Sequence, residues 1–476
     1  MMMNKRYMQA AAAVLLLAGT AACTSVKKNS SAQQTQTGVT AWVTDADNSL
    51  FFEPQTINGS KAAANMPVIT IDEQQTFQQM DGFGCTLTGG SAQLIQRMTP
   101  AARTALLKEL FDTTGRNIGM SYLRVSIGAS DLNDRIFSYD DMPAGETDFD
   151  LEHFSLAPDE ADVIPVLQQI LAINPRIKIL GSPWSAPVWM KNNGDTRGGS
   201  LLPRYQPAYA QYFVKYIKGM QQHGINIDAI TIQNEPLHPG NNPSMLMLPA
   251  QQADFIKNNL GPLFASEHIS TKIILYDHNA DRPDYPLSIL NDPGARKYVD
   301  GSAFHLYGGH IDTLASVHAA YPDKNLYFTE QWVGAPGNLK KDLDEHVRKL
   351  SIGAARNWCR TVLEWNLAAD PKQNPHTDRG GCNGCLGAVT IAGDTVSRNP
   401  AYYIIAQSAK LVRPGSVRIA SNEPEGLKNV AYRTPQGKKV LLVLNTGSTA
   451  KQFYIKDSHQ QVAVSLSPGA VATYTW

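Results

Sequence analysis

Short apolar segments and amphipathic segments take turns along most of this chain, between about residue 77 and residue 370. Eight strand-like segments cover residues 80–87, 121–127, 177–182, 229–234, 272–276, 301–305, 326–329 and 361–365. Six helix-like segments lie among them, at residues 100–111, 158–173, 207–223, 249–264, 311–321 and 339–357. This alternation predicts a closed parallel (β/α)8 barrel, the TIM-barrel architecture, over residues 77–407. An open doubly wound sheet is the alternative, but no Gly-x-Gly-x-x-Gly sequence follows an early strand.

The pattern changes after about residue 408. Short alternating strands follow at residues 417–419, 429–432, 440–445, 452–455, 462–466 and 472–476, with proline and glycine between some of them. Residues 408–476 are therefore expected to form a small antiparallel β-sandwich. Residues 40–76 are also extended in character and are expected to join that sandwich. The predicted fold class is α/β, a (β/α)8 barrel with a side antiparallel β-sandwich built from both chain ends.

The first residues have the layout of a secretory signal. Lys5 and Arg6 precede an apolar run at residues 10–17 that is too short to span a bilayer, and small residues lead up to Cys23. Residues 1–23 thereby resemble a bacterial lipoprotein signal, in which Cys23 is acylated, although Thr20 stands where leucine is usual. Ordinary secretory cleavage near Ala22 is the alternative.

Residues 24–39 are mostly serine, threonine, glutamine, asparagine and lysine, a composition typical of a flexible tether. An acylated cysteine followed by a tether indicates export. We therefore expect an outer-membrane lipoprotein of a Gram-negative bacterium, on the cell surface or the periplasmic face, held to the membrane by a lipid anchor only.

The balance of charged residues indicates which kind of partner the chain can attract. Lysine plus arginine and aspartate plus glutamate both number 42, so the formal net charge is zero. A neutral chain has no bulk field that attracts nucleic acid or an anionic membrane surface. We expect a neutral partner.

Polar and aromatic residues end most of the predicted strands. In a (β/α)8 barrel, residues at the carboxyl ends of the strands form one ring around the mouth. The ring comprises Asp131, Trp184, Trp189, Asn234, Glu235, His278, His305, Tyr307, Glu330, Trp332, Trp365 and Asn366. Aromatic faces among hydrogen-bonding groups suit the C–H faces and hydroxyl edges of a sugar. The histidines lack the spacing of a metal site, so neither a metal nor a cofactor is expected.

Two glutamates in this ring are candidates for the chemistry. Glu235 ends the run at residues 229–234, and Glu330 ends the run at residues 326–329. The fourth and seventh strands lie nearly opposite each other, so both carboxyl groups are expected to project into one cavity. Most glycoside hydrolases use a pair of carboxyl groups placed in this way. For a single glutamate of this kind, pairing with an arginine would be an equally good interpretation.

Motifs along six of the predicted strands resemble a known family. They are Asp81–Gly84, Arg124 with Asp131, Ser182–Lys191, Gln233–Pro236, Phe328–Gln331 and Glu364–Asn366. Together they are similar to glycoside hydrolase family 30, the family of lysosomal glucosylceramidase, over essentially the whole folded chain. The resemblance implies a retaining β-glycosidase with a (β/α)8 barrel and a side β-sandwich.

The resemblance also implies roles for individual residues. Glu235, between asparagine and proline, takes the acid/base position, and Glu330 takes the nucleophile position. Before attack Glu235 must hold a proton, which the charge of ionised Glu330 is expected to favour. Substrate contacts are expected from Asp131, Trp184, Asn234, His305, Tyr307, Trp332 and Trp365. Tyr307 is also expected to donate a hydrogen bond to Glu330.

Export permits disulfides, and Cys382 and Cys385 lie close together in a glycine-rich segment. A tight disulfide loop is the preferred interpretation, because two cysteines supply only half of a zinc site and a redox role would need a thioredoxin-like context. Cys85 and Cys359 lie in apolar surroundings and are expected to be buried thiols.

The resemblance implies a polysaccharide or oligosaccharide substrate, and we expect a β-glucan. Within family 30, Ser185–Pro187, Pro236–Pro243 and the Cys382/Cys385 loop are most similar to the branch that cuts β-1,6-glucan internally. Two alternatives stay open. One is an exo-acting β-glucosidase, glucosylceramidase or β-xylosidase of the same family, and the other is a catalytically inactive glycan-binding lipoprotein.

Overall fold

The computed structural model describes residues 36–58 and 65–476. The predicted signal, Cys23 and most of the predicted tether lie outside these residues. The last four residues of the tether segment, 36–39, belong to strand β1 (Gln36–Asp45), which pairs with its neighbours although this end of it is polar. Within the described residues, no helix is both long enough and apolar enough to cross a membrane.

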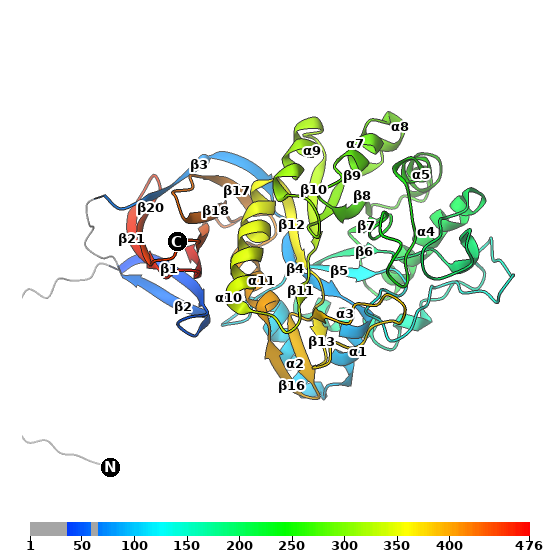
Figure 1. Ribbon diagram of the computed structural model, residues 1–476, viewed down its shortest axis with the longest axis horizontal. Helices are drawn as coiled ribbons and strands as arrows, with labels where there is room; N and C mark the ends of the chain where they lie inside the picture. The colour runs from blue at the N-terminus through cyan, green and yellow to red at the C-terminus, as the bar shows by residue number, and fades with distance from the viewer. Residues whose placement is uncertain (1–35, 59–64) are drawn as a thin grey trace, which may run out of the picture. The chain divides into compact units, whose positions relative to one another are not determined.

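Eight parallel strands close into a barrel at the centre of Figure 1, in the order β10-β12-β4-β5-β6-β7-β8-β9. Their bounds are β4 (Gly82–Leu87), β5 (Tyr122–Ser126), β6 (Lys178–Ser182), β7 (Ala229–Thr231), β8 (Lys272–Asn279), β9 (Val299–His305), β10 (Asn325–Glu330) and β12 (Cys359–Glu364). Each corresponds to one predicted strand, so the barrel prediction is confirmed and the open sheet is excluded. Nearly all of these strand residues are buried, because helices cover the barrel outside while side chains fill it inside.

Helices surround the barrel. The α-helices are α1 (Gly89–Arg97), α2 (Pro100–Phe111), α3 (Val163–Ile173), α4 (Gln206–Gln222), α5 (Pro249–Phe255), α6 (Gly261–Ser266), α7 (Asp284–Leu290), α8 (Pro293–Arg296), α9 (Leu314–Ala320), α10 (Leu339–His346) and α11 (Pro400–Ala409). Two π-helical stretches, η4 (Ile256–Leu260) and η6 (Val347–Ala354), continue α5 and α10. Short 3-10 turns are η1 (Ala157–Asp159), η2 (Val188–Met190), η3 (Pro203–Tyr205) and η5 (Ile311–Thr313).

Four helices lie outside the predicted helical segments, for physical reasons. Helix α1 begins with two glycines, which are poor helix formers. Helices α7 and α8 have seven and four residues, too few to show a period. Helix α11 contains aromatic and β-branched residues that favour strands in isolation, and it runs across the predicted boundary at residues 407 and 408.

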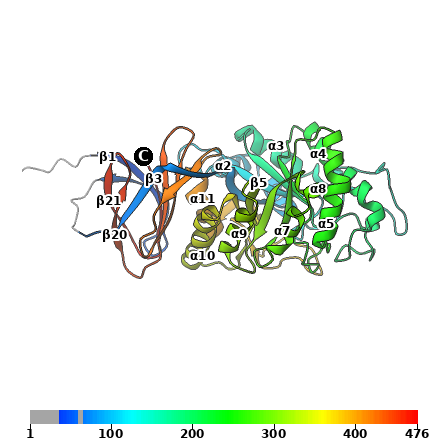
Figure 2. The ribbon, with the colours of Figure 1, turned by 90° about the horizontal axis from the view of Figure 1, so that it is seen from above.

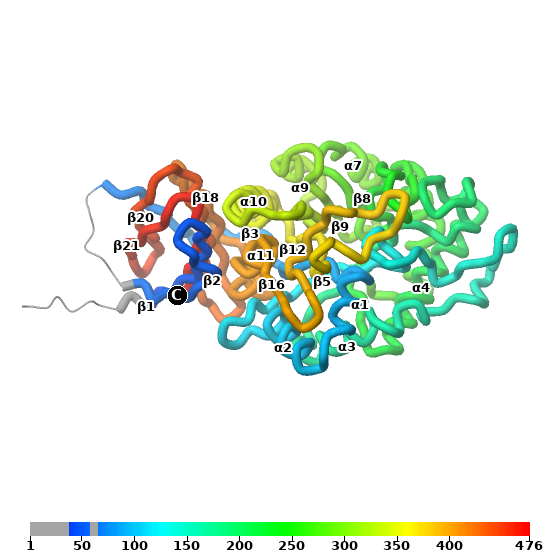
Figure 3. Tube along the Cα trace, turned by 60° about the horizontal axis from the view of Figure 1, so that its bottom comes forward, coloured from blue at the N-terminus to red at the C-terminus, as the bar shows by residue number. Residues whose placement is uncertain are grey.

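The side domain joins both ends of the described chain. Its strands run in the order β2-β1-β22-β19-β18-β17-β3-β20-β21. Besides β1 they are β2 (Leu50–Asn58), β3 (Val68–Gln79), β17 (Val417–Ser421), β18 (Leu427–Arg433), β19 (Lys439–Asn445), β20 (Lys451–Lys456), β21 (Gln461–Leu466) and β22 (Val471–Thr475). Strand β1 pairs with β22 near the C-terminus, as Figure 3 shows, and β3 pairs with β17 and β20. The predicted sandwich from both chain ends is confirmed, with one parallel pair, β3 with β20.

The sandwich packs on the barrel through α11 and η6. Figure 2 shows α10 and α11 between the sandwich strands and the barrel. The Gln407 side chain on α11 donates to Thr44 Oγ1 of β1 at 2.7 Å, and Arg356 donates to the carbonyl oxygen of Asn429 at 2.6 Å. These contacts tie the side domain to the barrel.

Small strands complete the carboxyl end of the barrel. Strand β11 (Val333–Gly334) pairs with β14 (Cys385–Leu386), and β13 (Ala368–Ala369) pairs with β15 (Val389–Ala392), which pairs with β16 (Thr395–Arg398). A disulfide joins Cys382 and Cys385, whereas Cys85 and Cys359 are buried free thiols. The β11–β14 pair therefore fixes the disulfide loop beside the mouth of the barrel.

Candidate active site

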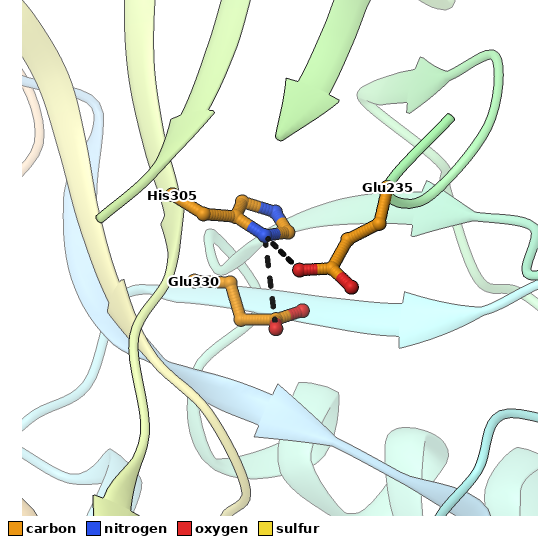
Figure 4. A group of neighbouring side chains, drawn as sticks. All are labelled: Glu235, His305 and Glu330. Carbon is orange, nitrogen blue, oxygen red and sulfur yellow. Dashed lines mark hydrogen bonds and ion pairs between the residues drawn. The ribbon is translucent and has the colours of Figure 1, made fainter. Parts of the chain in front are cut away.

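The two glutamates meet at the mouth of the barrel. Glu330 is the last residue of β10, and Glu235 follows β7 in a turn with a φ of 46°. A non-glycine residue in this left-handed region is strained, and the backbone N–H of Glu235 is fixed by a 2.9 Å hydrogen bond to the Asp277 carbonyl oxygen. Carboxylate oxygens of the two glutamates and a ring nitrogen of His305 all lie within 4.8 Å of one another (Figure 4). One substrate atom can therefore contact both carboxyl groups.

Arg124 holds the nucleophile candidate. This fully buried arginine on β5 donates from Nη1 to Glu330 Oε2 at 2.5 Å, and Tyr307 donates from its hydroxyl to Glu330 Oε1 at 2.9 Å. Both oxygens of Glu330 thus have a fixed donor. Burial raises the pKa of Glu330, whereas the charges of His305 and Arg124 oppose that rise by favouring the carboxylate.

Asp277 is the second carboxylate that neutralises Arg124. It accepts from Arg124 Nη2 at 2.8 Å, from Thr329 Oγ1 at 2.6 Å and from Thr231 Oγ1 at 2.7 Å. Burial would raise the pKa of Asp277, but Arg124 and His305 hold it far below its usual range. The site is thereby built around an ionised Arg124 between two carboxylates.

The same arginine orients Asn234. Arg124 Nη2 donates to Asn234 Oδ1 at 2.7 Å, which assigns the oxygen of this amide to the arginine. The amide nitrogen is then directed elsewhere, and Asn234 lines the cavity beside Glu235. Asn234 is therefore a hydrogen-bond donor toward a ligand in the cavity.

His305 lies against both glutamates and Asp277. Its Nε2 lies 3.1 Å from Asp277 Oδ1, and its Nδ1 lies 3.2 Å from Glu235 Oε1 and 3.7 Å from Glu330 Oε1. Burial lowers the pKa of His305, but Glu330, Asp277 and Glu235 raise it to about 9. Burial raises the pKa of Glu235, but the hydrogen bond and charge of His305 outweigh it, so the net direction is downward.

This arrangement differs from the sequence expectation. Ionised Glu330 was expected to favour a proton on Glu235, but the hydrogen bond and charge of His305, 3.2 Å away, lower the pKa of Glu235. Coupled groups of this kind titrate as a set, and the 3.2 Å contact is short enough for a proton to pass between His305 Nδ1 and Glu235.

Stacked tryptophans form one wall of the cavity. The rings of Trp184 and Trp365 lie 5.4 Å apart at an interplanar angle of 29°, and the Arg124 guanidinium lies 4.8 Å from the Trp184 ring. Trp332 is 37% exposed at the rim. These rings offer flat apolar surfaces beside the glutamates, as a sugar ring requires.

The cavity has a volume of about 370 Å³, within the range of small-molecule sites. It is lined by Asp131, Trp184, Asn234, Glu235, His238, Asn241, His278, Asn279, Tyr307, Glu330, Trp332, Trp365, Cys382 and Cys385. His305 lies just beneath it, through its contacts with both glutamates. Every predicted catalytic and substrate-binding residue thus lies in or against one cavity. Of the wider ring, Trp189 lines a different cavity, and the Asn366 side chain accepts from Thr88 and Ser91 instead.

Asp131 and the disulfide share one wall. Burial, together with the charges of Glu330 and Glu235, raises the pKa of Asp131 to about 7, and a backbone hydrogen bond from Cys382 opposes the rise. Cys385 packs in one apolar cluster with Leu132, Trp184 and Trp365. The disulfide loop thus contacts both the tryptophan wall and the acidic side of the cavity.

Three groups come close enough to share a cation, namely Glu235, His305 and Glu330. Arg124 and Tyr307 already donate to Glu330, and Asp277 accepts from the far nitrogen of His305. The Arg124 guanidinium therefore already supplies a permanent positive charge next to Glu330. This arrangement suits proton transfer better than the binding of a further cation.

The sequence analysis did not identify Asp277 and Asn241 as site residues. Tyr276 and Asp277 both have a positive φ, and the pairing register of β8 with β9 shifts there. The resulting bulge directs both Asp277 and His278 into the site, which a regular strand cannot do. Asn241 donates to Glu235 Oε2 at 3.4 Å from the loop after β7. Asp277 directly follows the apolar run at residues 272–276, and this position at the end of a predicted strand could have identified it as a site residue.

Two family models match this chain. The glycosyl hydrolase family 30 TIM-barrel domain matches residues 80–412, and the family 30 beta sandwich domain matches residues 415–474. The chain belongs to glycosyl hydrolase family 30. The family 30 barrel and sandwich therefore account for nearly all of the described residues.

Individual family 30 relatives are similar over most of their length. An endo-1,6-beta-D-glucanase of Aspergillus fumigatus is 34% identical over 405 residues, which cover 79% of this chain and 81% of the relative. The lysosomal acid glucosylceramidase of Mus musculus is 30% identical over 86% of this chain and 83% of its own length. A solved endo-beta1,6-glucanase superposes with a TM-score of 0.86 at 34% identity, covering 92% of this chain and 99% of that structure.

Proposed function

We propose that this family 30 chain is a retaining endo-β-1,6-glucanase that uses Glu330 as nucleophile and Glu235 as acid/base. The observation that carries this proposal is the approach of the two carboxyl groups to within 4.8 Å across one cavity. Retaining glycosidases place their carboxyl groups about 5–5.5 Å apart, whereas inverting enzymes need about 6.5–9.5 Å to admit a water molecule. The β-1,6 linkage is supported by the endo-1,6-glucanases among the similar proteins.

In the first step a Glu330 oxygen forms a bond to the anomeric carbon while the bond to the glycosidic oxygen breaks. Glu235 gives its proton to that departing oxygen. Glu235 obtains the proton from His305, 3.2 Å away. Esterification of Glu330 removes a negative charge that raises the pKa of both His305 and Glu235, so Glu235 can act as a base in the second step.

In the second step a water molecule attacks the anomeric carbon, Glu235 accepts its proton, and Glu330 departs as a carboxylate. Arg124 and Tyr307 stabilise that carboxylate through their two hydrogen bonds. The Asn234 amide nitrogen donates to the sugar 2-hydroxyl, a contact that strengthens in the oxocarbenium-like transition state.

Product analysis tests this function. The purified protein is incubated with β-1,6-glucan, β-1,3-glucan, an aryl β-glucoside and glucosylceramide, with Glu330→Gln and Glu235→Gln as inactive controls. Mixed oligosaccharides released early from β-1,6-glucan support the proposal. Release of monosaccharide alone would indicate the exo-acting alternative, which the similarity to glucosylceramidase favours. Tight association without cleavage would indicate an inactive glycan binder.

We also propose that the enzyme is exported and anchored through an acylated Cys23. The apolar run and the small residues before Cys23 support this proposal. In a Gram-negative host, the wild-type chain should sediment with outer membranes and incorporate a fatty-acid label. Cys23→Ala should do neither, and equal membrane recovery of both chains would contradict the anchor.

A further inference from the structure

A second cavity lies beside the active site, on the same face of the barrel. Its volume is about 630 Å³, larger than that of the catalytic cavity. Three segments form it: the loop between β5 and η1, residues 185–205 after β6, and Pro243 after β7. All three follow carboxyl ends of barrel strands, where ligands bind in this fold.

Neighbouring residues of the chain line both cavities, so the two share a wall. Trp184 lines the catalytic cavity, and the next residue, Ser185, lines the second one. After β7, Asn241 lines the catalytic cavity and Pro243 lines the second one. Asn241 donates to Glu235 Oε2 at 3.4 Å. The loop after Glu235 therefore separates the cavities on the side where the leaving group departs.

Preorganised aromatic rings line the second cavity. The Trp189 indole N–H donates to the carbonyl oxygen of Asp140 at 3.0 Å and to Asp140 Oδ2 at 3.1 Å. The Trp189 ring packs edge-on against Tyr205 at 5.0 Å, and Phe137 adds a third ring. Rings already fixed before binding lose little entropy when a ligand covers them.

The charged groups of the second cavity do not select for an ionic ligand. Lys191 donates to the carbonyl oxygens of Thr196 and Ser244, at 3.1 and 2.9 Å, and the Arg204 guanidinium lies 4.7 Å from the Tyr205 ring. Two carboxylates, Asp141 and Glu146, also line the cavity. Burial lowers the pKa of Lys191 to about 7, and its hydrogen bonds are to backbone carbonyls. Polar groups of both signs around aromatic faces suit a neutral, hydroxyl-rich ligand.

We propose that this cavity binds glucose units of the leaving-group part of the same glucan chain, beyond the bond that is cleaved. The inference rests on the proposed function. Trp189 and its neighbours then bind glucose units that lie away from the reacting atoms. Only a long substrate has such units, so these residues contribute to the binding of long substrates only. Cleavage of a long chain then gains binding free energy that a short substrate cannot supply.

The test fills the cavity from its exposed edge. Ala144 is exposed and lines the cavity, so Ala144→Trp should occupy it without disturbing the core. Ala101→Trp, at an exposed position on α2, is the matched control. For each protein, kcat/KM is measured on a long β-1,6-linked glucose oligomer and on the shortest such oligomer that the wild type cleaves. We compare the ratio of kcat/KM on the long oligomer to kcat/KM on the short one. This long-to-short ratio does not depend on the fraction of active enzyme.

Ala144→Trp should lower the long-to-short ratio by about tenfold, through a higher KM for the long oligomer, and Ala101→Trp should leave it unchanged. Trp189→Ala should lower the same ratio. An unchanged ratio in both cavity variants would overturn this inference and leave the proposed function intact. If the wild type cleaves no β-1,6 oligomer of any length, the proposed function fails and this inference fails with it.

Discussion

The hydrogen bond from Tyr307 to Glu330 offers a clean perturbation of the active site. The Tyr307 hydroxyl lies 2.9 Å from Glu330 Oε1, and the residue is 40% exposed at the cavity rim. Tyr307→Phe removes one donor to the nucleophile and keeps the ring that packs edge-on against His305 at 6.0 Å. Because the site is partly open to solvent, the change should scarcely affect the free energy of unfolding.

The expected loss follows from the kind of hydrogen bond. A hydrogen bond to a charged group contributes about 1.5–3 kcal/mol, and partial exposure places this one near the lower end. Each 1.4 kcal/mol corresponds to tenfold, so kcat should fall about 10- to 30-fold as the departing Glu330 carboxylate loses a donor. Loss of the donor also disfavours the carboxylate, so the acid limb of the pH profile should move to higher pH.

The assay is steady-state hydrolysis of β-1,6-glucan across pH, with thermal unfolding measured on the same samples. Tyr321→Phe is the matched control, because its hydroxyl donates to Asn291 on the barrel exterior. A Tyr307→Phe kcat within twofold of the wild type, with an unmoved acid limb, would refute the assignment of Tyr307 as a support of the nucleophile.

Three further perturbations test other parts of the site. His305→Gln should lower kcat and move the alkaline limb of its pH profile to lower pH, because Glu235 alone must then hold the proton; an unmoved limb would exclude proton sharing. The folded chain keeps a proton on Asp131 up to about pH 7, whereas an ordinary aspartate releases it near 3.8, so wild-type stability should fall between these pH values. Asp131→Asn should flatten that fall in chemical denaturation, and equal slopes would contradict it. Reduction of the Cys382–Cys385 disulfide should lower kcat/KM reversibly without unfolding the barrel, while the Cys382→Ser/Cys385→Ser variant should be slow and insensitive to reductant.

The barrel could be predicted because its strands and helices have different hydrophobic periods. Each of the eight strands contains a short apolar run, and α2 has the predicted bounds, with Pro100 in its first turn. The boundary at α11 could not be placed, because an apolar, aromatic helix packed between two domains resembles a strand in sequence. Tertiary packing overrides local propensity there.

The glutamate pair was predictable from position on the strands, but its electrostatics were not. Glu330 ends β10 and Glu235 follows β7, three strands away around the barrel, so topology brings them to the same mouth. The role of Asp277 depends on a bulge in β8, and the role of His305 as proton carrier depends on distances to three carboxylates. Neither leaves a periodic signal in the sequence.

The most direct test of the account is to trap the covalent intermediate. A 2-deoxy-2-fluoro-β-glucoside with a good leaving group slows both steps and allows the glycosyl-enzyme to accumulate. Mass spectrometry of peptides from the inactivated enzyme should find one fluoroglucosyl group, attached to Glu330, and Glu330→Gln should take up no label. Label on Glu235, or rapid turnover that inverts the anomeric configuration, would contradict double displacement through Glu330.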